Sequence, residues 1–286
     1  MKITDTTKSF LELFHSNKSA TIDELQQYHA EYPEIFQTYF NGYCQWSEER
    51  LINSLKRYEK KIELIQNNAA QLPAIVEEVF ERMSTYFSFK PELEVRLFVG
   101  CFGSNAYVDH HCNLHFSVEM LSSALDCLKV LVAHEMAHAF HYLFLNEAKF
   151  DWSKIKLDGY SSLYFEGVAT YVSSLVIPDI GRSIYFTYNE SGDEWLRFSE
   201  KNKDKIIGAL SEDLGEWSME KEREWFRLSG GKHFGYNRLG YFIGNEYIKT
   251  RNRSIKETMT FWVKESLQKD IQNWLQLYRK GANRND

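Results

Sequence analysis

Proline, paired cysteines and long apolar runs are all scarce in this sequence of 286 residues. The 4 prolines are too few to interrupt many helices, so long helices are expected. The 4 cysteines include no CxxC pair, which argues against both a disulfide framework and a cysteine-based zinc site. We therefore expect reduced and mostly buried thiols at Cys44, Cys101, Cys112 and Cys127.

A net positive charge and membrane-spanning segments are also lacking. The formal net charge is −6, whereas a nucleic-acid-binding protein usually needs a basic face. No segment approaches about 18 uninterrupted apolar residues, and the first residues contain no apolar run of secretory length. We expect a cytoplasmic protein that binds neither nucleic acid nor membrane, and no sequence pattern indicates its oligomeric state.

The hydrophobic pattern that is present indicates a mostly helical α+β protein. Hydrophobic residues make up 43% of the chain, and their spacing is helical over residues 1–90. The period changes in "ELEVRLFVG" and "NLHFSVEML", which alternate like strands. We expect a helical extension at 1–90 and a second domain at 91–286. In that domain a small antiparallel or mixed sheet (92–120) precedes helices at 123–147, 161–176 and 184–280.

The stretch "LKVLVAHEMAHAFHYLF" contains an HExxH pattern inside an apolar helix. Residues four apart on a helix lie about 40° apart around its axis, so His134 and His138 can reach one metal ion from the same face. Glu135 is rotated away from that face and can instead reach a metal-bound water. Burying these groups without a partner would cost several kcal/mol, so a metal site is favoured over a buried helix with ordinary core histidines.

A third metal ligand has three candidates: His141, Glu147 and Glu166. His141 lies two helical turns from His134, about 10 Å along the axis. It is better explained as a core histidine, or as one that supports the metal ligands without binding the metal itself. Glu147 falls at the end of the helix. Glu166 lies in a separate apolar helix, "SSLYFEGVATYV", where an unpaired carboxylate would be costly, and small residues follow it. We favour Glu166.

Together, "HEMAH", "EGVATYV" and "GYNRLGYFIGNEYI" resemble the gluzincin metallopeptidases, and most closely a poorly characterised bacterial family of predicted zinc-dependent proteases. The resemblance covers roughly residues 92–280 and implies a zincin-like fold. It implies one Zn²⁺ per chain, a peptide or protein substrate, and Glu135 as general base. It also implies that the strand segment "NLHFSVEML" offers its edge to an extended peptide.

The resemblance further implies a downstream Tyr or His that stabilises the oxyanion. "KHFGYNRLGY" offers His233, Tyr236, Arg238 and Tyr241, of which Tyr236 is preferred and His233 is second. Thr170 replaces the aspartate that in many gluzincins orients a zinc-bound histidine, and we place it with His141 among the outer partners. The aminopeptidase segment GxMEN is absent, and the spacer between His138 and Glu166 is longer than in thermolysin-like enzymes.

Two other readings of the chemistry stay open. The same zinc centre could serve an amidase acting on a small non-peptide substrate, or it could stabilise a catalytically inactive interaction protein. The substrate, the endo- or exopeptidase preference and a lid role for residues 184–232 are not indicated. "VDHH" at 108–111 is similar to a phosphoesterase motif, but the upstream DxD of those enzymes is absent, so a polar turn is expected there.

Overall fold

The computed structural model describes residues 1–286 except 15–19, 157, 252, 264 and 283–286. Contacts divide the chain into two compact units, Met1–Ala139 and Phe140–Asp286. The division falls inside one long helix, α6 (Leu125–Glu147). The mostly helical α+β class is confirmed, whereas the expected domains, 1–90 and 91–286, remain a prediction.

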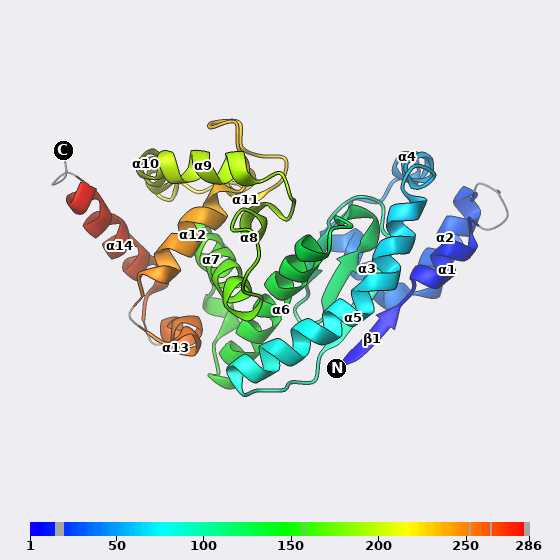
Figure 1. Cartoon of the computed structure of the whole chain (residues 1–286), viewed down its shortest axis with the longest axis horizontal. Coiled ribbons are helices and arrows are strands. Elements are labelled where there is room, and N and C mark those ends of the chain that lie inside the picture. Colours follow the sequence, from blue (N-terminus) through cyan, green and yellow to red (C-terminus); the bar gives the residue numbers. More distant parts are fainter. Residues whose placement is uncertain (15–19, 157, 252, 264, 283–286) are drawn as a thin grey trace. The chain divides into compact units, whose positions relative to one another are not determined.

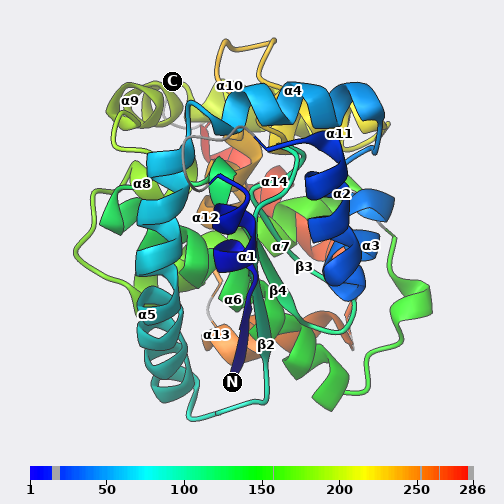
Figure 2. The same cartoon turned by 90° about the vertical axis from the view of Figure 1, so that its right-hand side faces the viewer.

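In the first unit, helices surround a small mixed sheet (Figures 1 and 2). The helices between the first and second strands are α1 (Thr7–Glu12), α2 (Ile22–Glu31), α3 (Pro33–Gly42), α4 (Glu48–Tyr58) and α5 (Ile62–Phe87). The strands are β1 (Lys2–Asp5), β2 (Glu94–Phe98), β3 (Ala106–Val108) and β4 (Leu114–Ser117), followed by the 3₁₀ turn η2 (Val118–Met120). Thr21 caps α2 with Glu24 in a reciprocal capping box, which is the signal that the sequence carries there.

Within the described residues the strand order is β1-β2-β4-β3, with β1 and β4 parallel to β2 and β3 antiparallel to β4. The expectation of a wholly helical segment before residue 90 is therefore wrong at its start, because Lys2–Asp5 pairs with Glu94–Leu97. The expected peptide-binding edge is also wrong. Strand β4 lies between β2 and β3, so its backbone groups already pair on both sides, and the edges of the sheet are β1 and β3.

The loop after β2 is held by a buried carboxylate. Glu119 is fully buried and accepts hydrogen bonds from the backbone N–H groups of Gly100 and Phe102 and from the Ser117 hydroxyl. Burial raises the pKa of Glu119, while these donors favour its charged form. The interaction ties the end of β2 to the end of β4.

The second unit is helical throughout its described elements. After the end of α6 it contains η3 (Trp152–Lys154), α7 (Gly159–Val176), α8 (Ile184–Thr187), α9 (Asp193–Lys201), α10 (Lys203–Asp213), α11 (Met219–Phe226), α12 (Leu239–Lys249), α13 (Ile255–Thr260), η4 (Phe261–Val263) and α14 (Leu267–Ala282). Asp158 caps α7 by accepting from the N–H groups of Tyr160 and Ser161. No described helix of the chain is long and apolar enough to cross a membrane.

Helices α7 and α12 pack so closely that their backbones touch (Figure 1). A Cβ atom added at Gly167 would lie 2.5 Å from the carbonyl carbon and oxygen of Gly244. Backbone atoms cannot swing aside like the end of a flexible side chain, so both glycines are required at this crossing. Because Gly167 follows Glu166 directly, the crossing also fixes the part of α7 that carries this carboxylate.

Replacing Gly167 by alanine is expected to lower the free energy of unfolding by about 3 kcal/mol, through overpacking against Gly244. Gly208, inside α10, is the matched control, because a Cβ there would meet no atom within 4 Å. Gly208→Ala should raise the free energy of unfolding by roughly 0.5–1 kcal/mol, the usual gain of alanine over glycine in a helix. Chemical denaturation followed by circular dichroism measures both, and equal effects would contradict the close helix crossing.

Candidate metal centre

Helix α6 carries the HExxH residues in its most buried stretch. Every residue from 130 to 141 is buried, including His134, Glu135 and His138 at 2%, 9% and 8% exposed. A helix that is apolar on all sides is expected in an interior, which explains why this sequence forms a long buried helix. Polar side chains in such a position need specific partners.

The two histidines of the motif point their Nε2 atoms at one another. The two atoms are 3.2 Å apart, and the imidazole planes cross at 85°. Two nitrogens bound to one zinc ion at about 2.05 Å in tetrahedral geometry would be about 3.3 Å apart. The distance between the two Nε2 atoms and the orientation of the rings are therefore those expected if His134 and His138 bind the same zinc ion.

A carboxylate on the next long helix completes a group of three. Glu166 is half-buried on α7, and the ligand atoms of His134, His138 and Glu166 all lie within 4.8 Å of one another. Among the residues that the structure describes, this is the one group of three or more His, Cys, Asp or Glu side chains that could hold a metal ion. Glu147 and His141, the other sequence candidates, are not part of it.

The structure places His141 in the core of the second unit. It is fully buried, and its Nε2 donates to the carbonyl oxygen of Met259 over 2.8 Å. Its ring lies 5.0 Å from that of Phe165 and 5.4 Å from that of Tyr164. These contacts are those of a histidine packed in a core, which agrees with the preference for Glu166 over His141 as the third metal ligand.

Thr170 is 1% exposed, and its hydroxyl makes no hydrogen bond to any described residue. It lies one helical turn after Glu166 on α7. A bond from Thr170 to either histidine of the HExxH motif is therefore not present in this conformation. Its role as an outer partner, like that of His141, remains a prediction.

Tyr236 and His233 lie on the loop between α11 and α12. The Tyr236 ring packs 4.5 Å from Phe198, and partial desolvation together with the Glu194 carboxylate raises the pKa of Tyr236. His233 is exposed, and its backbone N–H donates to Glu224. Neither residue belongs to the metal-ligand group, so their catalytic roles also remain predictions.

Sequence reasoning missed the part that Glu224 plays in this loop. The acidic runs between residues 189 and 224 suggest solvated helix faces, yet the Glu224 carboxylate accepts from the N–H groups of Gly231, Lys232 and His233. The partners lie 7 to 9 residues away in a loop, so no local spacing signals them. Glu224 thereby holds the loop that carries both predicted oxyanion donors.

The "VDHH" segment forms the polar turn that was expected. Asp109 accepts from the N–H groups of His111 and Asn113, and its other oxygen lies 3.0 Å from Nε2 of the buried His115. Burial raises the pKa of Asp109, but the hydrogen bonds from His115 and Asn113 outweigh it and hold that pKa well below its usual range. Asp109 therefore organises the connection between β3 and β4.

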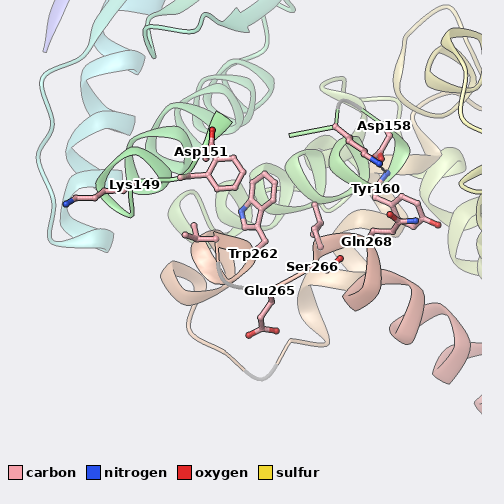
Figure 3. A pocket seen from close by; sticks show the side chains of 12 residues that line it. Lys149, Asp151, Asp158, Tyr160, Trp262, Glu265, Ser266 and Gln268 are labelled. Carbon is pink, nitrogen blue, oxygen red and sulfur yellow. Dashed lines mark hydrogen bonds between the residues drawn. The ribbon is translucent and has the colours of Figure 1, made fainter. Parts of the chain in front are cut away.

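A pocket of about 370 Å³ lies elsewhere in the second unit (Figure 3). Lysines, acids and aromatic side chains line it together, among them Lys149, Asp151, Asp158, Tyr160 and Trp262. None of the predicted site residues is among the residues that line it. Its mixed charge favours no single class of ligand.

An HExxH helix, with a His-His-Glu group in a mostly helical α+β fold, defines a protein that could hold a metal ion beside a further buried carboxylate, that of Glu135. A family model described as "Putative zinc dependent peptidase (DUF5700)" matches residues 7–251. The match spans most of the chain, so the chain belongs to this family. Neither the curated proteins nor the solved structures include one that matches the chain.

Proposed function

We propose that the protein is a zinc-dependent peptidase of the gluzincin type, with one Zn²⁺ per chain held by His134, His138 and Glu166. The observation that carries the proposal is the clustering of these three ligand atoms around an HExxH helix. Two imidazoles and one carboxylate are a known donor set of catalytic zinc sites, and they leave one position open. The family description supports the same metal and the same reaction class.

When bound, zinc would acidify a water molecule and polarise the scissile carbonyl group. Glu135 then acts as the general base: its carboxylate accepts the proton of the attacking water and delivers it to the leaving amine. Its place next to His134, about 100° further around α6, keeps it from the face that the two histidines share. The apolar surroundings of α6 limit the access of bulk water and strengthen these polar interactions.

The other roles follow the same proposal. Tyr236, or else His233, donates a hydrogen bond to the oxyanion, and their loop is steadied by Glu224. His141 and Thr170 support the ligand helices from outside the metal centre. An extended peptide substrate that pairs with the sheet would use an edge strand, β1 or β3, since β4 is already paired on both sides.

Metal analysis combined with a peptide-library digest tests the function. We expect about one zinc per purified chain by the proposed stoichiometry, and cleavage that a chelator abolishes and added zinc restores. Protein that holds stoichiometric zinc but cleaves no peptide in the library would overturn the peptidase proposal. In that case, hydrolysis of small amides would indicate the amidase, and its absence would indicate an inactive metal-stabilised protein.

A further inference from the structure

Arg238 is a buried cation with no anionic partner among the residues that the structure describes. It is 6% exposed, and its buried Nε–H group has no hydrogen-bond partner among the described residues. Its contacts are with aromatic faces: the guanidinium carbon lies 4.6 Å from the ring centre of Tyr188 and 5.2 Å from that of Tyr241. Cation–π contacts offset part of the cost of burial but satisfy none of the N–H donors.

Two other arginines of the chain, one buried and one partly buried, can be compared with Arg238. Arg96 donates to Glu94 over 3.2 Å and to the carbonyl oxygen of Glu34, and Arg251 donates to Asp270 over 2.7 Å. Both therefore have a carboxylate partner. Arg238 is as buried as Arg96, but the contacts of its guanidinium within the described residues are with the rings of Tyr188 and Tyr241.

The backbone around Arg238 is held in an unusual conformation. Arg238 has φ 60° and ψ 22°, in the left-handed region that costs a non-glycine residue about 1 kcal/mol. The preceding residue, Asn237, is held by two hydrogen bonds. Its backbone carbonyl accepts from the Trp195 indole, and its side-chain amide donates to the carbonyl oxygen of Leu228. A strained residue that its surroundings hold in place is a common feature of binding sites.

Arg238 also stands at the start of α12, which begins without a side-chain cap. The first turn of a helix presents backbone N–H groups and a positive dipole end, both of which favour an anion. A guanidinium at the same place adds a full positive charge with a planar array of donors that matches a carboxylate. The buried cation and the uncapped helix start therefore point to the same class of ligand.

We infer that Arg238, between Tyr188 and Tyr241, is a binding subsite for a carboxylate of the peptide substrate. That the ligand is a peptide substrate rests on the proposed peptidase function. Two sources share this chemistry: the free α-carboxylate at the end of a peptide, and the side chain of an internal Asp or Glu. The subsite would make the enzyme prefer acidic over neutral peptides.

Binding of three short peptides separates the possibilities. The probes are N-acetylated tetra-alanine with a free carboxylate, the same peptide as its C-terminal amide, and the amide with one internal aspartate. They are titrated by calorimetry into zinc-loaded full-length protein carrying Glu135→Gln, so that turnover does not consume them. At least one carboxylate peptide should bind about tenfold or more tightly than the neutral amide, as expected for a charge-assisted hydrogen bond.

Arg238→Met should remove this preference, while Arg238→Lys keeps the charge and retains part of it. Arg182→Met is the control, because Arg182 is exposed and pairs with Glu200 on the surface of the same unit. If the protein with Arg238 intact binds all three peptides equally, the inference is wrong, and this result does not depend on any Arg238 variant being folded. The inference is also wrong if a folded Arg238→Met protein still prefers the carboxylate peptides over the neutral amide.

The outcome is separable from that of the peptidase proposal. If peptides are cleaved but acid and amide bind equally, the subsite is wrong and the peptidase stands. If carboxylate peptides bind through Arg238 but no peptide is cleaved, the peptidase is wrong and the binding site stands.

Discussion

Replacing Glu135 by glutamine is expected to lower the rate of peptide hydrolysis by roughly 100- to 10,000-fold, the usual contribution of a general base. Glutamine has nearly the same shape but cannot accept the proton of the attacking water. The loss should appear in kcat, because the substrate still binds. Steady-state kinetics on a peptide found in the library digest measure it.

The structure makes Glu135→Gln a clean variant. Glu135 is buried on α6 and is not one of the three grouped ligands, so the change should leave zinc content and fold intact. Glu147→Gln is the matched control, since Glu147 is exposed at the end of the same helix. A Glu135→Gln protein that keeps its zinc and its full activity would exclude Glu135 as the base.

Replacing Glu166 by alanine should weaken zinc binding by more than the roughly 10- to 100-fold that the loss of an outer partner costs. The variant keeps both histidines, but a protein site with two ligands does not close around zinc as one with three does. Competition with a fluorescent zinc chelator measures the affinity directly. Activity should fall in parallel at zinc concentrations that saturate the unaltered protein.

Glu147→Ala serves as the control for this experiment, because Glu147 was a sequence candidate for the third ligand and lies outside the metal group. Its zinc affinity should match that of the unaltered protein. If Glu166→Ala binds zinc normally, the third ligand lies elsewhere. A loss of affinity in Glu147→Ala instead would assign the ligand to the end of α6.

Much of the architecture was readable from local pattern. The alternation in "ELEVRLFVG" and "NLHFSVEML" corresponds to β2 and β4, and the predicted helices at 123–147 and 161–176 correspond to α6 and α7. These elements are strongly periodic or uniformly apolar, so the local pattern and the tertiary environment agree. The segment "SGGKHFGYNRLG" also predicts a glycine-rich turn before α12, and Gly231 and Gly235 adopt positive φ there.

Elements that depend on distant partners were not readable. Strand β1 has only 4 residues and pairs with β2 some 90 positions later, and β3 has 3 residues inside a turn-like segment. The spacing Ser254-x-x-Glu257 predicts a capping box and one helix that continues to about residue 280. The capping box is present, but α13 ends at Thr260 and α14 begins only at Leu267. Ser266, which accepts from the N–H of Lys269, was the available signal for that second start.

By itself the sequence determined which donors the candidate metal centre can offer. An HExxH spacing on a helix places two imidazoles on one face and a carboxylate beside it, whatever the rest of the fold. Only the tertiary structure decided which distant residues join them. It grouped Glu166 with the two histidines, bonded His141 to Met259, and placed Arg238 between two tyrosines, with no anionic partner among the described residues. Helix geometry fixes neighbours three and four residues apart, whereas contacts across tens of residues depend on how whole helices pack.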